Sequence, residues 1–98
     1  MDVEFADASL DRLEREAAFT GGWAEGIVKA FRKRMQTIRA APDERDFYML
    51  KSLHFEKLKG KRLGQHSMRL NEQYRLIVKL VTRSHGKIVL VIEITDYH

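Results

Sequence analysis

Residues 65–80 read QHSMRLNEQYRLIVKL, and this stretch decides the fold. Apolar and polar side chains alternate on either side of residues 71–73, and this period of two is typical of strands. The two runs are therefore expected to form a hairpin closed by residues 71–73, with the even-numbered residues on one face. That set is mostly apolar and predicts the face against the core: His66, Met68, Leu70, Tyr74, Leu76, Val78 and Leu80.

The same hairpin pairs Leu70 with Tyr74 and places Arg69 opposite Arg75 on its polar face. Like charges directly opposite each other destabilise a strand pair. Either water screens the two guanidinium groups or an anion sits between them. The pairing therefore favours anion binding on the polar face.

Two further strands are expected outside the hairpin. The apolar run of residues 88–94 predicts a central strand buried on both faces, because it offers no continuous polar face. The loop around residues 83–86 is too long to fix the register of that strand. Residues 3–5, in which apolar and acidic side chains alternate, predict a short edge strand.

The first half of the chain has helical periodicity. A first helix is expected to be capped by Asp7 or Ser9, to end at Gly21-Gly22, and to turn four residues inward: Leu10, Leu13, Ala17 and Ala18. A second helix breaks at Ala41-Pro42-Asp43, because proline supplies no amide hydrogen. Its apolar stripe comprises Trp23, Ile27, Val28, Phe31, Met35 and Ile38.

A chain of 98 residues has surface for one core, so residues 1–98 are expected to form a single domain. The order of the elements predicts the α+β class, with two N-terminal helices packed on a small, mainly antiparallel C-terminal β-sheet.

Composition narrows the class of protein. The chain has no cysteine, which excludes disulfides and thiolate metal sites. Its first residues are acidic and no apolar run approaches the roughly 18 residues of a membrane span, so we expect a cytoplasmic protein with no membrane partner. The net charge is +4, and residues 57–87 contain nine Lys or Arg against one acid, Glu72. This concentration of positive charge suggests a polyanionic partner.

Cations in this region could contact the phosphates of a nucleic acid, which requires no particular spacing. The alternative is a merely solvated basic face. Charge alone leaves the two interpretations about equal, and the opposition of Arg69 and Arg75 favours binding. The candidate RNA-binding residues are Lys57, Lys61, Arg62, Arg69 and Lys79.

Histidine can transfer protons near neutral pH. Of the four histidines, His66 on an apolar face and His85 in a loop are expected to be structural or exposed. His54 and His98 each lie beside other reactive groups and are candidates for catalysis. No paired metal-ligand spacing is present, so neither a metal nor another cofactor is expected.

Several motifs occur together in one order: Leu58-Lys59-Gly60, Gly64-Gln65-His66-Ser67, the run Arg69-Leu70-Asn71-Glu72-Gln73-Tyr74-Arg75, and Asp96-Tyr97-His98. With these, the second half of the chain resembles the HigB branch of the RelE/ParE toxin superfamily, part of type II toxin-antitoxin systems. The first half resembles that family only in its two-helix pattern.

The resemblance implies a RelE-like fold and an endoribonuclease, an mRNA interferase that enters the ribosomal A site, cleaves mRNA without metal and inhibits translation. It also implies a helix-turn-helix antitoxin, HigA-like, that holds the toxin inactive in a hetero-oligomer. By position, the resemblance implies catalytic roles for His54, Lys59, Arg75, Asp96, Tyr97 and His98, with Glu56 the rival of His54 by its spacing from Leu58-Lys59-Gly60.

Two other functions are compatible with the sequence. One is a non-catalytic, ParE-like inhibitor that binds gyrase, because the same fold hosts both activities. The other is a basic RNA-binding module without toxicity. The cluster Asp96-Tyr97-His98 favours the nuclease, since a pure binder has no need of grouped proton-transfer residues.

Overall fold

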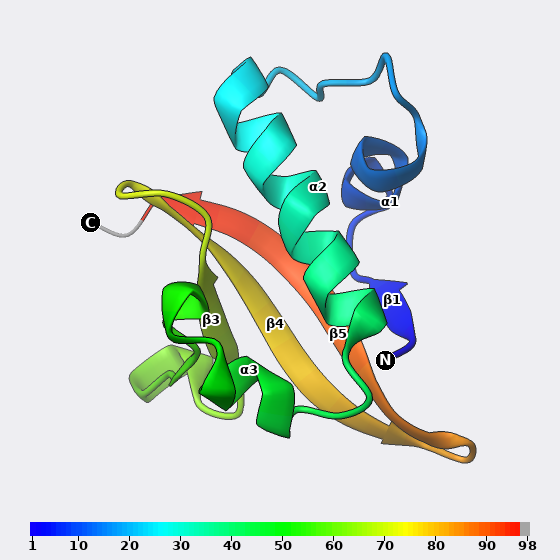
Figure 1. The fold of residues 1–98 in the computed structure, drawn as a ribbon, viewed down its shortest axis with the longest axis vertical. Helices are drawn as coiled ribbons and strands as arrows, with labels where there is room; N and C mark the ends of the chain where they lie inside the picture. Colours follow the sequence, from blue (N-terminus) through cyan, green and yellow to red (C-terminus); the bar gives the residue numbers. More distant parts are fainter. Residues whose placement is uncertain (97–98) are drawn as a thin grey trace.

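A five-stranded mixed sheet with helices on one face forms the protein, and the computed structural model describes residues 1–96 (Figure 1). The strands are β1 (Val3–Phe5), β2 (Glu56–Lys57), β3 (His66–Arg69), β4 (Tyr74–Arg83) and β5 (Gly86–Asp96). The helices are α1 (Ala8–Arg15), α2 (Glu25–Ala40) and α3 (Arg45–Met49), with two 3-10 turns, η1 (Lys51–Leu53) and η2 (Gly60–Arg62).

The strand order is β1-β5-β4-β3-β2. All neighbours are antiparallel except β1, which pairs with β5 in parallel. The α+β class and the mainly antiparallel sheet are therefore confirmed, and so is the edge strand at residues 3–5. The sheet is not confined to the C-terminal half, because β1, the first strand of the chain, completes it.

Strands β3 and β4 form the predicted hairpin. Arg69 pairs with Arg75, and the amide of Leu70 donates to the carbonyl of Tyr74. The turn is fixed by Asn71, whose side-chain oxygen accepts from the amides of Gln73 at 2.9 Å and Tyr74 at 2.7 Å. Such an asparagine turn imitates a backbone turn and sets the register of the strands it joins.

Helix α2 lies across β4 and β5 (Figure 1) and contributes most of the helical core. Five of the six residues of its predicted apolar stripe are buried, because residues three or four apart share one helix face. The exception is Trp23, which precedes the helix and is half-buried. The strands meet this stripe with alternate residues. The largest fully buried side chains include Phe31, Phe47, Leu13, Met35, Ile38, Leu53, Met68 and Leu76.

Helix α1 begins as predicted, with Asp7 accepting from the amide of Ser9. It ends at Arg15 rather than at Gly21-Gly22, and Ala17 and Ala18 are exposed. The reason is Arg32 of α2, whose guanidinium donates to the carbonyls of Leu13, Glu16, Ala17 and Phe19 at 2.9 to 3.2 Å. An arginine with five donors satisfies the carbonyls that the end of a helix leaves open.

Strand β5 differs from its prediction in two ways. Ser84 and His85 alone connect it to β4, because Arg83 pairs with Gly86, so the connection is short and fixes the register. The strand also contains a bulge: Ile77 pairs with Glu93 but Val78 pairs with Val91, which leaves Ile92 as an extra residue. The run is apolar at almost every position because the inward-facing positions of β5 change from odd to even at the bulge, and not because both faces are buried throughout. Ile92 is only half-buried.

The third helix, α3, was expected only as a short connecting segment. Phe47 is its buried anchor, while Tyr48, Met49 and Leu50 are exposed. None of the helices within residues 1–96 is long and apolar enough to cross a membrane.

Candidate functional site

The sheet face opposite α1 and α2 carries the candidate site, and we call it the open face. Strand pairing aligns Glu56, Ser67, Ile77 and Glu93 in one row across β2, β3, β4 and β5. The neighbouring row holds Arg69, Arg75 and Thr95. Because side chains alternate along strands, residues from four strands converge here that are far apart in the sequence.

Arg75 is the centre of the open face. Its guanidinium donates to the carbonyl oxygen of His54 at 3.1 Å and to Oγ of Ser67 at 3.0 Å. The other terminal nitrogen lies 3.7 Å from Oε1 of Glu56. Its side chain is only 11% exposed, so these contacts hold a cation in a nearly buried position. A cation fixed in this way is suited to stabilising charge that develops on an adjacent phosphate.

His54 occupies an unusual backbone conformation, with φ of 47° and ψ of 52°. A non-glycine residue in the left-handed region costs about 1 kcal/mol or more and is frequent at functional sites. This conformation follows the end of η1 and directs the His54 carbonyl toward Arg75.

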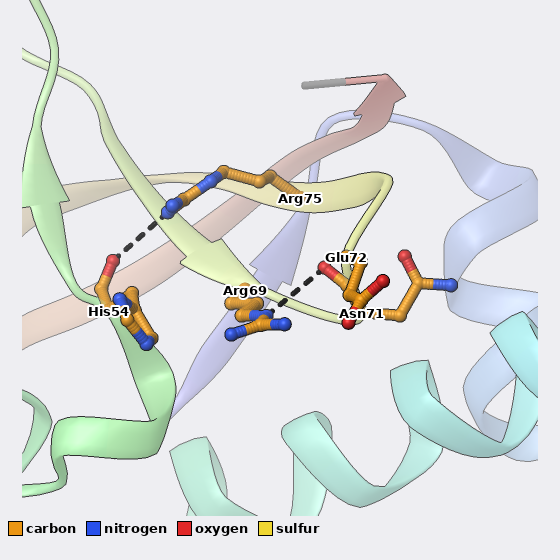
Figure 2. Close-up of a pocket in the computed structure, with 5 residues that line it drawn as sticks. All are labelled: His54, Arg69, Asn71, Glu72 and Arg75. Carbon is orange, nitrogen blue, oxygen red and sulfur yellow. Dashed lines mark hydrogen bonds between the residues drawn. The ribbon is translucent and has the colours of Figure 1, made fainter. Parts of the chain in front are cut away.

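A first pocket of about 200 Å³ lies between the two arginines of the hairpin. Figure 2 shows the five residues that line it: His54, Arg69, Asn71, Glu72 and Arg75. Arg69 turns toward the hairpin turn and donates to the carbonyl of Asn71 at 3.3 Å, while Arg75 turns toward His54. The two like charges are thus separated by a hollow with a guanidinium on two sides, where an anion could bind, although the Glu72 carboxylate also lines it.

A second pocket of about 230 Å³ lies on the other side of Arg75, which lines both. Its remaining lining residues are Glu56, Leu58, Arg62, Ser67, Ile77, Thr95 and Asp96. Arg62 forms an ion pair with Glu93 and donates to Oε1 of Gln65 at 3.0 Å. The predicted residues Glu56, Arg62, Arg75 and Asp96 are therefore brought together.

Asp96 ends β5 and pairs with Tyr74, the first residue of β4. Its Oδ2 accepts a hydrogen bond from Nε2 of Gln73 at 3.0 Å, which ties the strand end to the hairpin turn. Tyr97 and His98 lie outside the described residues.

The other predicted cations are placed differently. Lys59 and Lys61 are exposed in the segment between Leu58 and Arg62, which both line the second pocket. Lys79 is exposed on β4, four residues beyond Arg75. Lys57 pairs with His66, so alternation places it on the opposite side of the sheet from Glu56. The structure does not bring Lys57 to the open face.

His66 is buried and belongs to an aromatic cluster on that opposite side. Its ring stacks on Phe55 at 4.6 Å, and Nε2 lies 3.5 Å from the hydroxyl of Tyr48. Burial, with a smaller effect from Lys57, lowers the pKa of His66 below its usual value. His66 therefore packs as a neutral ring, and its surroundings agree with the structural role expected for it.

The open face combines a hydrogen-bonded cation, carboxylates and an imidazole, which are the groups needed for acid-base chemistry on a phosphodiester. Sequence reasoning missed Ser67, Gln73 and Glu93 as members of this site. Ser67 and Glu93 share the row of Ile77, so the register of the strands was the signal that could have found them. Among residues 1–96, no group of three or more His, Asp or Glu is arranged to hold a metal ion.

Comparison with known proteins gives a match over nearly the whole chain. The family model described as the RelE-like toxin of the type II toxin-antitoxin system HigB matches residues 3–98. A YoeB/ParE toxin from Agrobacterium tumefaciens is similar in structure, with a TM-score of 0.62 and 17% identity over all of both chains. A YoeB-YefM complex from Staphylococcus aureus matches with a TM-score of 0.60 and 17% identity, over all of this chain and 97% of that chain. These two similarities concern the fold alone. The search of curated proteins found no match.

Proposed function

This chain belongs to the family of RelE-like, HigB-type toxins of type II toxin-antitoxin systems, and we propose that it is a ribosome-dependent endoribonuclease. In this proposal it enters the ribosomal A site, cleaves mRNA without metal and so stops translation. The observation that carries the proposal is the nearly buried Arg75, held by His54 and Ser67 between two pockets of the open face.

The proposed reaction is an internal transfer within the RNA. A base removes the proton of a 2′-hydroxyl, and the 2′-oxygen attacks the adjacent phosphorus. The bond to the 5′-oxygen then breaks, and an acid protonates that oxygen, which leaves a 2′,3′-cyclic phosphate and a 5′-hydroxyl. Arg75 and Lys59 stabilise the negative charge of the five-coordinate phosphorane.

Two residues are candidates for the base. Glu56 lies 3.7 Å from Arg75, and His54 lines the first pocket beside Arg69 and Arg75. Glu56→Gln and His54→Gln each remove proton-transfer capacity while keeping a polar side chain. The variant with the larger loss of maximal cleavage rate, and with the loss of the acidic limb of the pH profile, identifies the base.

The acid is proposed to come from Asp96, Tyr97 and His98. Deleting Tyr97 and His98 should leave a folded protein without toxicity, because it removes an imidazole and a phenol beyond the core strand. Unchanged growth arrest by the truncated protein at matched expression contradicts this assignment. Circular dichroism and antitoxin binding serve as the controls for folding.

The partner is proposed to be a helix-turn-helix, HigA-like antitoxin that forms a hetero-oligomer with this chain. The S. aureus similarity is to a chain solved in a YoeB-YefM complex, which supports partnership with an antitoxin in general. Co-expression with the neighbouring small open reading frame should restore growth and yield a complex on gel filtration.

The function itself is tested by inducing the protein in a bacterial host and mapping the 5′ ends of ribosome-bound mRNA. We expect new ends at A-site codons, and no comparable cleavage of the same RNA without ribosomes. Equal cleavage of naked RNA contradicts ribosome dependence. Intact mRNA together with altered DNA supercoiling indicates a gyrase inhibitor instead, and intact mRNA with no growth arrest indicates an RNA-binding module.

A further inference from the structure

Arg62 is fixed in a way that the rest of its loop is not. It closes η2, a short turn whose neighbours Lys61 and Leu63 are exposed. Its Nη1 donates to Gln65, and its Nη2 pairs with the carboxylate of Glu93 on β5. A long side chain in an exposed loop otherwise keeps considerable rotamer freedom, so two anchors restrict Arg62 to one direction.

The ion pair adds little to stability. The side chains of Arg62 and Glu93 are 38% and 43% exposed, and exposed pairs typically contribute about 0–1 kcal/mol. The two hydrogen bonds also engage only two of the five N–H groups of the guanidinium, and the described residues offer the others no further partner. Arg62 can therefore donate to a ligand while Glu93 holds it.

The second pocket is where such a ligand would lie. Arg62 and Arg75 both line it, and Leu58 and Ile77 supply apolar surface between charged groups. Its volume of about 230 Å³ is below the roughly 300–1,000 Å³ typical of pockets that enclose a small molecule. The carboxylates of Glu56 and Asp96 also line it, so the two arginines can hold phosphate beside groups able to transfer protons. A pocket of this size with such a lining suits one unit of a longer chain that carries phosphate.

We propose that this pocket is a nucleotide subsite next to the cleaved linkage, in which Arg62 binds a phosphate and Glu93 is the positioning residue for Arg62. Leu58 and Ile77 pack against the ribose or base of the same nucleotide, as apolar side chains do with unpaired RNA. The proposal deepens the proposed function and rests on it, since the ligand is the mRNA. It assigns roles to Glu93 and Ile77, which lie on the row beside Arg75.

The variants for the test are Glu93→Gln, Glu93→Asp, Arg62→Ala and the double variant Arg62→Ala/Glu93→Gln. The chain offers a matched control in Glu4→Gln, because Glu4 pairs with Arg83 at side-chain exposures of 43% and 42%. That pair joins β1 to the end of β4 near the Ser84-His85 turn, away from both pockets. Thermal unfolding of each variant checks that the fold is kept.

Two measurements use ribosomes programmed with a short mRNA. Single-turnover cleavage gives the maximal rate and the half-saturating toxin concentration. Binding of the toxin to the same complex, with 2′-deoxy nucleotides in the A-site codon, gives an affinity that does not depend on cleavage. Both are measured across salt concentrations, because each lost phosphate contact lowers the salt dependence.

We expect Glu93→Gln to weaken binding about fivefold to tenfold while the maximal rate stays within about twofold, as for a contact made equally in the ground and transition states. Glu93→Asp should recover part of the affinity. Arg62→Ala should weaken binding at least as much and lower the salt slope by about 0.7, the value per phosphate on a single strand. The double variant should equal Arg62→Ala, because Glu93 acts through Arg62.

Several results overturn the inference. Unchanged affinity in Glu93→Gln removes Glu93 from the subsite, and a lower maximal rate at unchanged affinity makes it a proton-transfer group instead. Additive losses in the double variant, or an equal loss in Glu4→Gln, show that Glu93 does not act through Arg62. If the wild-type protein binds the ribosome complex without cleaving the mRNA, the nuclease proposal fails. The binding affinities of the variants then still test whether Arg62 and Glu93 form the subsite. If it neither binds nor cleaves, both proposals fail.

Discussion

The two faces of strand β4 differ although their residues alternate along one strand. Leu76 and Val78 are fully buried in the core beneath the helices. Arg75 and Ile77, one position away from each, line the pockets of the open face. Neighbouring residues of β4 thus contribute either to the core or to the candidate site. Which of the two depends on the face of the sheet to which the side chain points, and not on where the residue lies along the strand. Substitutions should therefore separate by face.

The largest effect on folding is expected on the face of β4 that the helices cover. Leu76→Ala should lower the free energy of unfolding by about 2–5 kcal/mol, because it removes buried apolar atoms and leaves a cavity. Urea denaturation measures this, with Leu63→Ala as the control, since Leu63 is 81% exposed. Cleavage per folded molecule should stay close to wild type, and a large loss there contradicts the separation.

The largest effect on activity is expected on the open face. Arg75→Ala should reduce the maximal cleavage rate about 10²–10³-fold, the range found when one group that stabilises transition-state charge is removed. Its cost in stability should be about 1–2 kcal/mol, because the carbonyl of His54 and the hydroxyl of Ser67 each lose a donor. Undiminished cleavage by a folded Arg75→Ala protein removes this residue from the site.

The pH dependence of stability should arise from His66, on the side of the sheet that the helices cover, rather than from the open face. The pKa of His66 is lowered in the folded state, so below about 6.5 the unfolded chain binds more protons. Stability should therefore fall as the pH drops from about 7.5 to 5.5, above the range in which most carboxylates titrate. The fall should be smaller in His66→Phe, whose ring can still stack on Phe55. If stability changes with pH equally in the wild-type protein and in His66→Phe, His66 is excluded as the cause of the pH dependence.

The smallest effects should distinguish two exposed lysines. Lys79→Ala should lower the salt slope of RNA binding by at most about 0.7, because one phosphate contact at most is lost. Lys57→Ala should leave the slope unchanged, since its position in the strand pairing points it away from the open face. A greater loss in Lys57→Ala than in Lys79→Ala reverses the assignment of the faces.

Local pattern predicted much of this fold. The hairpin register, including the opposition of Arg69 and Arg75, follows from alternation and a three-residue turn, both of which are local in sequence. The end of α1 was not predictable in this way, because it depends on Arg32 in another helix. For the same reason the residue types of the candidate site could be proposed from the sequence, but its contacts could not, since the contact of Glu93 with Arg62 depends on strand pairing.

The bulge at Ile92 has a consequence for how this chain tolerates insertions and deletions. Strand β5 contains two segments of opposite phase: Val89 and Val91 face the core from odd positions, and Ile94 faces it from an even one. Deleting Ile92 would leave an unbroken alternation in which Val91 and Ile94 still face the core. If Ile92 instead paired as an ordinary residue without the bulge, every side chain beyond it would exchange faces. Glu93 would then turn toward the core and Ile94 toward the open face. A single backbone irregularity therefore allows both segments of one strand to contribute to the same core.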